Sequence, residues 1–200
     1  MEITSDQVKL LRDKTGAGMM DCKKALSESA GNIDKAIEFL RKKGAATAEK
    51  RADRTTNQGV VEAYIHAGGR IGSMVELNCE TDFVAKTDDF KALAKDIAMQ
   101  VAAMSPQYIY REDVPKEIIE RELEIYKTQA LNEKKPAQVI DKIAQGKLEK
   151  YYQDTCLAEQ TFIKDSGKTI KDLILDLTAK TGEKVTIRRY QRYHLGEASS

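Results

Sequence analysis

The sequence predicts an α+β fold: a small three-helix domain followed by a core domain, in which a small antiparallel sheet packs with helices and a helical hairpin. Helical spacing of apolar residues dominates the first fifty residues. An alternating pattern with a Gly-Gly turn follows, and two charged segments then each open with proline. We expect residues 1–54 to form the helical domain with a basic linker, and residues 55–200 to form a core α/β domain that dimerises and binds a partner.

The composition indicates a folded protein without a strong charge bias. The chain has 200 residues, of which 41% are hydrophobic and 32% charged, enough for one ordinary domain and a small one. Its 33 basic and 32 acidic residues leave a net charge of +1, so nucleic acid is not the favoured partner. No apolar run approaches the roughly 18 residues of a membrane span, and the first residues lack a secretory signature. We therefore expect no membrane partner and a cytoplasmic location.

The cysteines and histidines do not predict a metal site, a cofactor site or a disulfide framework. Cys22, Cys79 and Cys156 are odd in number and widely spaced, which favours free thiols. The histidines, His66 and His194, stand far apart, and zinc would need clustered ligands. We expect neither a metal nor a cofactor.

The first fifty residues contain the start and stop signals of three helices. Thr4 and Gln7 match a capping box that opens a helix over about 5–14. A glycine-rich break precedes a second helix over 19–29, and Gly-Asn precedes a third, whose apolar residues share one face. Two lysines and a glycine predict that the third helix ends at Gly44.

The segment between the two expected domains, residues 50–58, is polar and basic. A solvated connector is favoured over an RNA contact because acidic residues are interspersed among the basic ones.

The core domain opens with a hairpin. Val61, Ala63 and Ile65 alternate with more polar residues, Gly68-Gly69 allows a tight turn, and the return strand covers 71–79 with Val75 facing inward. Thr87 then caps a helix with near-ideal apolar spacing up to residue 104.

The rest of the core is expected to be helical before it returns to strands. The proline-led segments 115–132 and 136–152 predict an antiparallel helical pair. A short strand near 156–163, a helix capped by Thr169 and a strand over 185–195 complete the core.

Motifs that would indicate catalysis fail on spacing. Residues 166–169, Ser-Gly-Lys-Thr, lack the earlier glycine of a phosphate loop, so we expect a turn and a helix cap. Gly16-Ala17-Gly18 follows a helix and lacks the third glycine of a dinucleotide site. No nucleophile with a partner base emerges, so the sequence does not predict an enzyme.

Two long segments differ in kind from these short matches. Residues 11–26 have the sequence LRDKTGAGMMDCKKAL, and residues 76–86 have the sequence ELNCETDFVAK. They resemble the two signatures of the elongation factor Ts family in the correct order and separation, and the similarity extends from Glu2 to about Glu197.

The resemblance implies a ubiquitin-associated-like N-terminal domain and a guanine nucleotide exchange factor that promotes GDP release from GDP-bound elongation factor Tu. The implied mechanism is non-covalent: the Asp82-Phe83 turn enters the partner near its magnesium and phosphate site. The partner-binding residues that the resemblance implies are Arg12, Met19, Met20, His66, Thr81, Asp82, Phe83 and Val84.

The resemblance also implies a homodimer. Longer family members carry two related core subdomains and an inserted coiled-coil hairpin, whereas this sequence has one core module. Short members look like homodimers in which the second subunit supplies the second contact. We name the C-terminal strand, residues 185–195, as a candidate interface because an unpaired strand invites pairing across a two-fold axis.

The residues themselves leave two structural questions open. Phe83 could staple the entry of the following helix and pack inward, which is the commoner arrangement for such a residue, or it could be an exposed wedge, as the resemblance implies. Met19 and Met20 follow a glycine-rich turn and cannot both face inward easily, so at least one should be exposed.

Two other function classes compete with nucleotide exchange. The first is a ubiquitin-like or peptide adaptor built on the three-helix domain. The second is an RNA-binding factor that would use the basic and aromatic residues of the last strand. These residues are Lys184, Arg188, Arg189, Tyr190, Arg192 and Tyr193. Neither class explains the second signature, and a solvated sheet edge is the favoured explanation of the basic strand.

Overall fold

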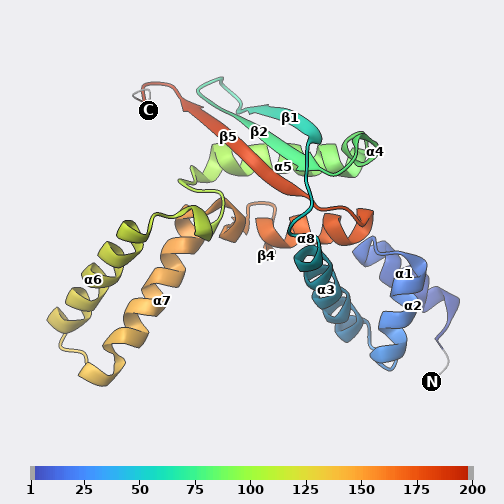
Figure 1. Ribbon diagram of the computed structural model, residues 1–200, viewed down its shortest axis with the longest axis horizontal. Coiled ribbons are helices and arrows are strands. Elements are labelled where there is room, and N and C mark those ends of the chain that lie inside the picture. Colours follow the sequence, from blue (N-terminus) through green and yellow to red (C-terminus); the bar gives the residue numbers. More distant parts are fainter. Residues whose placement is uncertain (1–2, 198–200) are drawn as a thin grey trace. The chain divides into compact units, whose positions relative to one another are not determined.

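The computed structural model describes residues 3–197 and has the expected α+β architecture (Figure 1). The described chain divides into two compact units. The first contains the chain up to Ala63, together with Met74–Asp96 and Asp172–Gln191. The second contains Tyr64–Ser73, Ile97–Lys171 and the segment from Arg192 onward. The outer ends of the two expected domains, residues 1–2 and 198–200, lie outside the described residues.

The N-terminal helices form where the sequence predicts them. They are α1 (Ser5–Thr15), α2 (Met19–Glu28) and α3 (Ile33–Lys50). The capping box is confirmed: the Gln7 N–H donates to Thr4 Oγ1 at 3.3 Å, and the Thr4 N–H donates to Gln7 Oε1 at 3.0 Å. The three helices enclose one apolar cluster. Its buried members are Val8, Leu11, Ala17, Cys22, Ala25, Leu26, Ala36 and Leu40.

The expected end of the third helix at Gly44 is wrong, because α3 continues to Lys50. Glycine inside a helix costs only about 1 kcal/mol relative to alanine. The sequence that follows, Ala-Ala-Thr-Ala-Glu-Lys, consists largely of good helix formers, which can offset that cost. Gly44 is also buried, and a Cβ there would lie 3.2 Å from the Ala179 Cβ, so a tight packing position accounts for the glycine.

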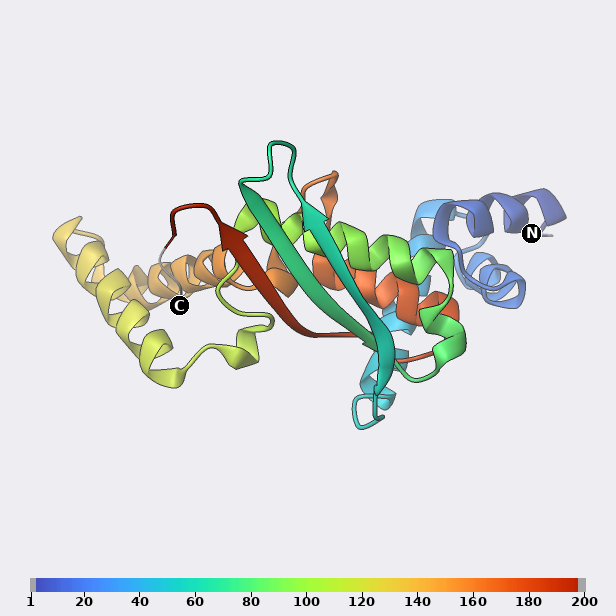
Figure 2. The ribbon, with the colours of Figure 1, turned by 90° about the horizontal axis from the view of Figure 1, so that it is seen from above.

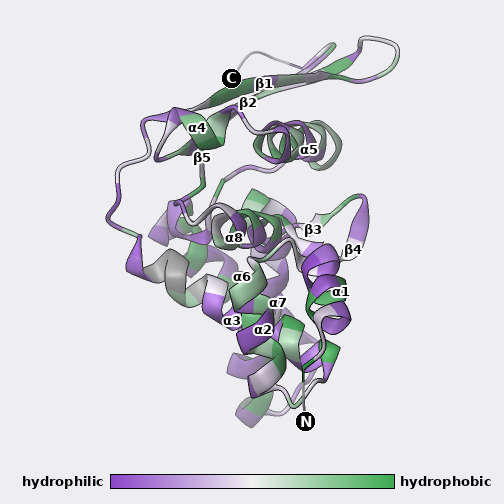
Figure 3. Cartoon of the chain, turned by 90° about the vertical axis from the view of Figure 1, so that its right-hand side faces the viewer, coloured by the Kyte–Doolittle hydropathy of each residue, from purple (hydrophilic) through white to green (hydrophobic). Residues whose placement is uncertain are grey.

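The core sheet is antiparallel and is formed by β1 (Gln58–Ile65), β2 (Ile71–Cys79) and β5 (Thr186–His194), in that order. Helix α5 (Asp88–Met104) runs along one face of the sheet (Figure 2). It lies between the sheet and α8 (Ile170–Thr181) (Figure 3). The expected apolar faces are confirmed, since Val75, Leu77, Phe90 and Ile97 are all buried.

The β1 backbone at Gly59 lies very close to β2. A Cβ on Gly59 would lie 2.1 Å from the Leu77 carbonyl oxygen and 2.8 Å from the Asn78 Cα. Only glycine fits at such a separation, so this residue fixes how β1 enters the sheet.

The other face of the sheet carries exposed apolar side chains. Val61 of β1 is 60% exposed and Met74 of β2 is 48% exposed. The alternating residues that predict β1, Val61, Ala63 and Ile65, therefore lie on the exposed side, while the partly buried positions belong to Val60, Glu62 and Tyr64. An apolar strand face without cover is unusual and marks a surface for binding.

The expected helical pair is confirmed as α6 (Lys116–Asn132) and α7 (Ala137–Thr155), which run side by side (Figure 1). Each follows its proline directly, since Pro115 and Pro136 are the N-cap residues. The buried residues at their base are Val114, Leu148, Tyr152 and Cys156.

The segment after α7 differs from the expectation of one short strand. It forms a 3₁₀ turn, η2 (Leu157–Glu159), and then a small hairpin of β3 (Thr161–Phe162) and β4 (Asp165–Thr169). The Ser-Gly-Lys-Thr sequence lies in β4 and not in a loop, so the expected turn there is wrong. A strand cannot cradle phosphates as a glycine-rich loop does, which agrees with the rejection of a phosphate site.

Candidate protein-binding site

The turn between β2 and α5 presents an aromatic side chain to solvent. It contains a single helical turn, α4 (Asp82–Ala85), in which Phe83 is 79% exposed and Ala85 is buried. Phe90, seven residues later, has no exposed surface. The staple interpretation of Phe83 is therefore wrong, because the side chain that packs into the core from this region is Phe90. A large exposed aromatic on a short turn is typical of a binding anchor.

The turn is held by a glutamate from the opposite end of the chain. The Thr81 N–H donates to Glu183 Oε2 at 2.9 Å, and the Thr81 hydroxyl donates to Glu183 Oε1 at 2.6 Å. Thr81 is the N-cap residue of α4, yet its side chain makes no capping hydrogen bond. The hydroxyl that would usually cap the helix is used to join two distant segments instead.

The carboxylate of Glu80, the residue before Thr81, accepts hydrogen bonds from three donors. The Lys184 N–H donates to its Oε1 at 2.6 Å, Arg51 donates to Oε1 at 3.1 Å, and Arg54 donates to Oε2 at 2.8 Å. Burial opposes ionisation of this carboxyl, but the Lys184 N–H and the two guanidinium groups outweigh burial and lower the Glu80 pKa to about 2. Glu80 is therefore ionised at neutral pH and joins three segments of the first compact unit.

The linker is consequently more than the solvated connector that the sequence favours. The Arg51 side chain is only partly exposed, and the Lys184 ammonium donates to the carbonyl oxygens of Ala52 and Arg54. The basic residues at 51 and 54 are held by Glu80, which also leaves them poorly placed for an RNA contact.

Two further interactions fix the base of the turn. The Cys79 thiol donates to the Thr81 carbonyl oxygen at 3.1 Å, and burial raises the pKa of Cys79 to about 11, so the thiol keeps its proton. Lys86 pairs with Asp82 at 2.5 Å, one helical turn apart, and the hydrogen bond from Lys86 lowers the Asp82 pKa. Asp82 and Val84, which flank Phe83, are themselves half-buried.

The N-terminal candidates form a second group at the junction of α1 and α2. Met19 is 45% exposed and Met20 is 76% exposed, which confirms and exceeds the expectation that at least one is accessible. Arg12, in the last turn of α1, is also exposed. Gly16 ends α1 in a left-handed conformation, with φ of 68°, so the chain reverses and brings the start of α2 beside the end of α1.

The third candidate region, the β1–β2 hairpin tip, belongs to the second compact unit. His66 is exposed there, and its Nδ1 lies 3.1 Å from the Tyr64 hydroxyl. Gly68 and Gly69 have φ values of 91° and 66°, which confirms the expected tight turn. The sequence candidates thus fall into three groups, of which only Thr81, Asp82, Phe83 and Val84 form one continuous turn.

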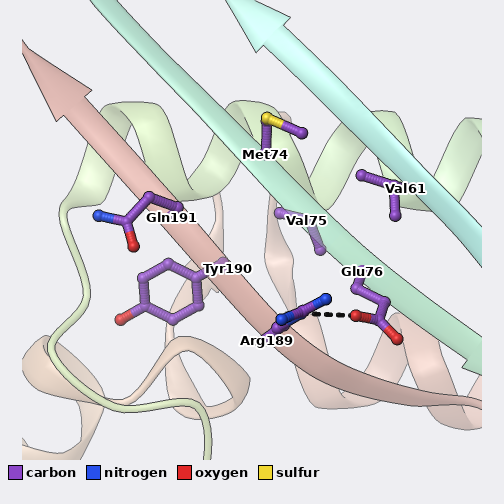
Figure 4. A pocket seen from close by; sticks show the side chains of 7 residues that line it. All are labelled: Val61, Met74, Val75, Glu76, Arg189, Tyr190 and Gln191. Atoms are coloured by element: carbon purple, nitrogen blue, oxygen red, sulfur yellow. Dashed lines mark hydrogen bonds and ion pairs between the residues drawn. The ribbon is translucent and has the colours of Figure 1, made fainter.

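The exposed sheet face contains a shallow hollow (Figure 4). Its lining residues are Val61, Met74, Val75, Glu76, Arg189, Tyr190 and Gln191. Arg189 Nε donates to Glu76 Oε2 at 2.7 Å across the hollow. Arg192 donates to the Ala102 carbonyl oxygen and to Glu197, so acceptors of the same chain engage these two strand cations. A nucleic-acid groove requires cations available for phosphate, and this arrangement does not favour one.

Three further observations on the described residues concern metal ligands, cysteines and membrane-spanning helices. No group of three or more potential ligands among residues 3–197 is arranged to hold a metal ion. Cys22, Cys79 and Cys156 are all buried free cysteines, as expected. In the part of the chain that is described, no helix is both long and apolar enough to span a membrane.

The structural roles of Glu80 and Glu183 were not predicted from the sequence. Glu80 lies within the second signature, but its partners Arg51 and Arg54 precede it by 29 and 26 residues. Glu183 meets Thr81 across 102 residues and lies outside both signatures. No local pattern predicts a contact of that range.

An exposed aromatic on a fixed turn, with exposed methionines elsewhere in the same compact unit, is the arrangement of a protein that acts by binding another protein. Residues 6–197 match the family model described as Elongation factor TS. The proteins named Elongation factor Ts from Carboxydothermus hydrogenoformans and Syntrophus aciditrophicus are both 60% identical to this chain, over 195 and 197 residues. The one from Thermotoga neapolitana is 58% identical over 197 residues.

These similarities extend over almost whole proteins. Each covers 98% of this chain, and they cover 90%, 98% and 99% of the Carboxydothermus, Syntrophus and Thermotoga proteins. The chain belongs to the elongation factor Ts family, which confirms the resemblance of the two signatures. The family identity supports a general role in translation elongation and in nucleotide exchange on elongation factor Tu.

Proposed function

We propose that this protein binds GDP-bound elongation factor Tu and promotes GDP release by inserting the Asp82-Phe83 turn near the partner's magnesium and phosphate site. The observation that carries this proposal is the 79% exposure of Phe83 on a turn that two carboxylates hold in place. We further propose that it does so in the cytoplasm, without a cofactor and without a covalent step.

The mechanism is a coupling of two binding equilibria. If this protein weakens GDP binding to its partner by some factor, GDP must weaken the binding of this protein by the same factor. Phosphate and magnesium order the switch segments of such partners, so an apolar group wedged beside them can release nucleotide without chemistry. A transient complex of the two proteins with GDP is the required intermediate.

The remaining candidate residues would hold the partner while the turn acts. Arg12, Met19 and Met20 offer a cation and two flexible thioethers on one small helical surface, which suits contact with another helix. His66 lies on a separate hairpin tip and would approach a more distant domain of the partner. Anchoring and nucleotide release are thus assigned to different residues, which makes the mechanism separable by mutation.

The direct test measures release of fluorescent GDP from elongation factor Tu after excess unlabelled nucleotide is added, with and without this protein. We expect release to accelerate with protein concentration and then to saturate. The protein alone should hydrolyse no GTP. Unchanged release at saturating protein, with a complex demonstrably formed, would contradict exchange activity while leaving binding intact.

We also propose that the protein is a homodimer whose interface includes β5 and the sheet face beside it. Two features support this: β5 is an edge strand of the sheet, and the adjoining face exposes Val61 and Met74. An edge strand can pair across a two-fold axis, and a second copy could cover the apolar face. The one core module of this chain would then be complemented by the partner subunit's module.

Light scattering at micromolar concentration tests the dimer. We expect a dimeric mass for the wild type and a monomeric mass for Met74→Lys, because an unpaired charge at a covered position opposes association. Leu131→Lys is the matched control, since Leu131 is an exposed apolar residue of α6. A monomeric wild type would exclude the dimer. A dimer that Gln191→Pro dissolves and Met74→Lys does not would point to pairing of β5 edges.

A further inference from the structure

Two glutamates at the base of the Phe83 turn form a reciprocal pair of contacts. Glu80 and Thr81 leave the end of β2, while Glu183 and Lys184 lead into β5. Glu80 accepts from the Lys184 N–H at 2.6 Å, and Glu183 accepts from the Thr81 N–H at 2.9 Å and from its hydroxyl at 2.6 Å. Each segment thus supplies a carboxylate to the backbone N–H of the other. We call this arrangement the Glu80–Glu183 clasp.

The Glu183 side of the clasp is itself fixed by the end of α8. The Gly182 N–H donates to the Thr178 carbonyl oxygen at 2.9 Å, and the Glu183 N–H donates to Thr181 Oγ1 at 3.3 Å. Gly182 has a φ of 71°, a left-handed conformation that suits glycine and that turns the chain at the helix end. The carboxylate of Glu183 therefore comes from a defined backbone position and not from a free loop.

The position of Thr81 makes this contact important for Phe83. Thr81 is two residues before Phe83 and is the N-cap of the single turn α4. A helix of four residues has little stability of its own, because the cost of helix nucleation is barely repaid over so short a length. Phe83 is also too exposed for core packing to fix its direction. The orientation of the aromatic ring therefore depends on what holds Thr81.

We propose that Glu183 is a positioning residue: by binding both donors of Thr81 it fixes the direction in which Phe83 leaves the turn, and so prepares the wedge before the partner arrives. This inference rests on the proposed function of the Phe83 turn. A preformed wedge avoids the entropy cost of ordering the turn during binding, and a small misdirection of a reacting or inserting group has a large kinetic effect. Glu183 contacts no nucleotide and acts only through Thr81.

A double-mutant cycle with Phe83 tests this role. Glu183→Ala should slow GDP release from elongation factor Tu about five- to tenfold at saturating protein, which is the net scale of one ordinary hydrogen bond. In a Phe83→Ala background the same substitution should have no further effect on release, because the aromatic side chain that Glu183 positions is absent. The affinity of the complex should change less than the maximal release rate.

Conservative substitutions at the other end of the contact separate positioning from general stability. Thr81→Val removes the hydroxyl donor and keeps the shape, so it should slow release, while Thr81→Ser keeps the donor and should slow release less than Thr81→Val does. Glu120→Ala is the matched control, since Glu120 is an exposed glutamate of α6 in the other compact unit. Glu183→Ala should still fold, because Glu80 and Lys184 continue to join the two segments.

The outcomes distinguish a failure of this inference from a failure of the proposed function. If Phe83→Ala leaves release unchanged, the wedge itself is wrong. If Phe83→Ala slows release but Glu183→Ala does not, or if the two effects multiply in the double variant, Glu183 does not aim Phe83. Melting curves on the same preparations identify any loss that comes from unfolding alone.

Discussion

The two ends of β2 lead into surface turns that are built in opposite ways. At the Cys79 end, the Phe83 turn is joined by hydrogen bonds and ion pairs to the linker and to the start of β5. At the Ile71 end, the hairpin tip with His66 has local contacts, such as the Gly69 N–H to the His66 carbonyl oxygen at 2.9 Å, and one backbone hydrogen bond from the Leu195 N–H to the Arg70 carbonyl oxygen at 2.8 Å. We therefore expect the first turn to be the more rigid of the two and the second to adapt more easily to a partner.

Phe83→Ala is the variant that tests the difference between the two turns most strongly. We expect GDP release to slow tenfold or more, the scale of a central anchor worth about 2 kcal/mol. The melting temperature should hardly change, because the side chain is 79% exposed. Release kinetics and thermal melts on one preparation measure both.

Phe90→Ala is the matched control for Phe83→Ala, since Phe90 is a fully buried phenylalanine seven residues away. It should cost about 3–5 kcal/mol of unfolding free energy by leaving a cavity in the core. Exchange per folded molecule should be preserved. The comparison of the two turns fails if Phe83→Ala destabilises the fold while its exchange per folded molecule stays normal.

The methionine pair tests whether anchoring and release are separate. Met19→Ala combined with Met20→Ala should weaken complex formation by about 1–2 kcal/mol, because both side chains are exposed and are proposed to contact the partner. Release at saturating protein should stay near wild type, since the Phe83 turn is intact. Titration calorimetry and release kinetics provide the two readouts.

Leu26→Ala on the same helix is the control for the methionine pair, because Leu26 is fully buried. Leu26→Ala should lower the free energy of unfolding by about 2–5 kcal/mol. The double methionine variant should keep its helical signal. Loss of helical content in the methionine variant would show instead that these side chains support the core.

Features of the fold that depend on nearby residues could be predicted from the sequence, whereas those that depend on distant residues could not. The capping box, the proline-led helices, the Gly-Gly turn and the Phe90 stripe depend on neighbours within a few residues, so the sequence predicts them. The continuation of α3 through Gly44 and the strand at 165–169 were missed, because local breaker signals competed with helix formers and strand pairing. The exposure of Phe83 was open until the resemblance favoured it, and the clasp with Glu183 depends on a contact over 102 residues.

Acid should weaken the Phe83 turn before it affects the hairpin tip. The folded-state pKa of Glu80, about 2, lies below the ordinary value of 4.5. A lowered carboxyl pKa adds stability that is fully present above the ordinary value and is lost as the pH falls toward the folded value. The contribution of Glu80 should therefore disappear between about pH 4.5 and pH 2. Hydrogen exchange of amides near 80–86 and 66–70 would compare the two ends directly.

Glu80→Gln is the variant that isolates this effect. It should remove most of the acid sensitivity of amides near residues 80–86, because Gln cannot be protonated in this range and accepts weaker hydrogen bonds from Arg51 and Arg54. Glu120→Ala should leave the acid profile as in the wild type. Equal acid sensitivity in the wild type and Glu80→Gln would show that another group governs the turn.

The smallest effect is expected from the hairpin tip. His66→Ala removes an exposed ring whose Nδ1 lies 3.1 Å from the Tyr64 hydroxyl, and no buried surface depends on it. Exposed contacts at the edge of an interface are worth less than central anchors, so affinity for elongation factor Tu should fall only about two- to fourfold. Release at saturating protein should be unchanged, because the proposed wedge lies at the other end of β2. Tyr64→Phe, which removes only the hydroxyl, should have a smaller effect still if Tyr64 merely orients His66. Surface plasmon resonance on both variants, beside release kinetics, would measure these losses. A His66→Ala variant that slows release as much as Phe83→Ala would mean that the hairpin tip, and not the clasped turn alone, drives nucleotide exchange.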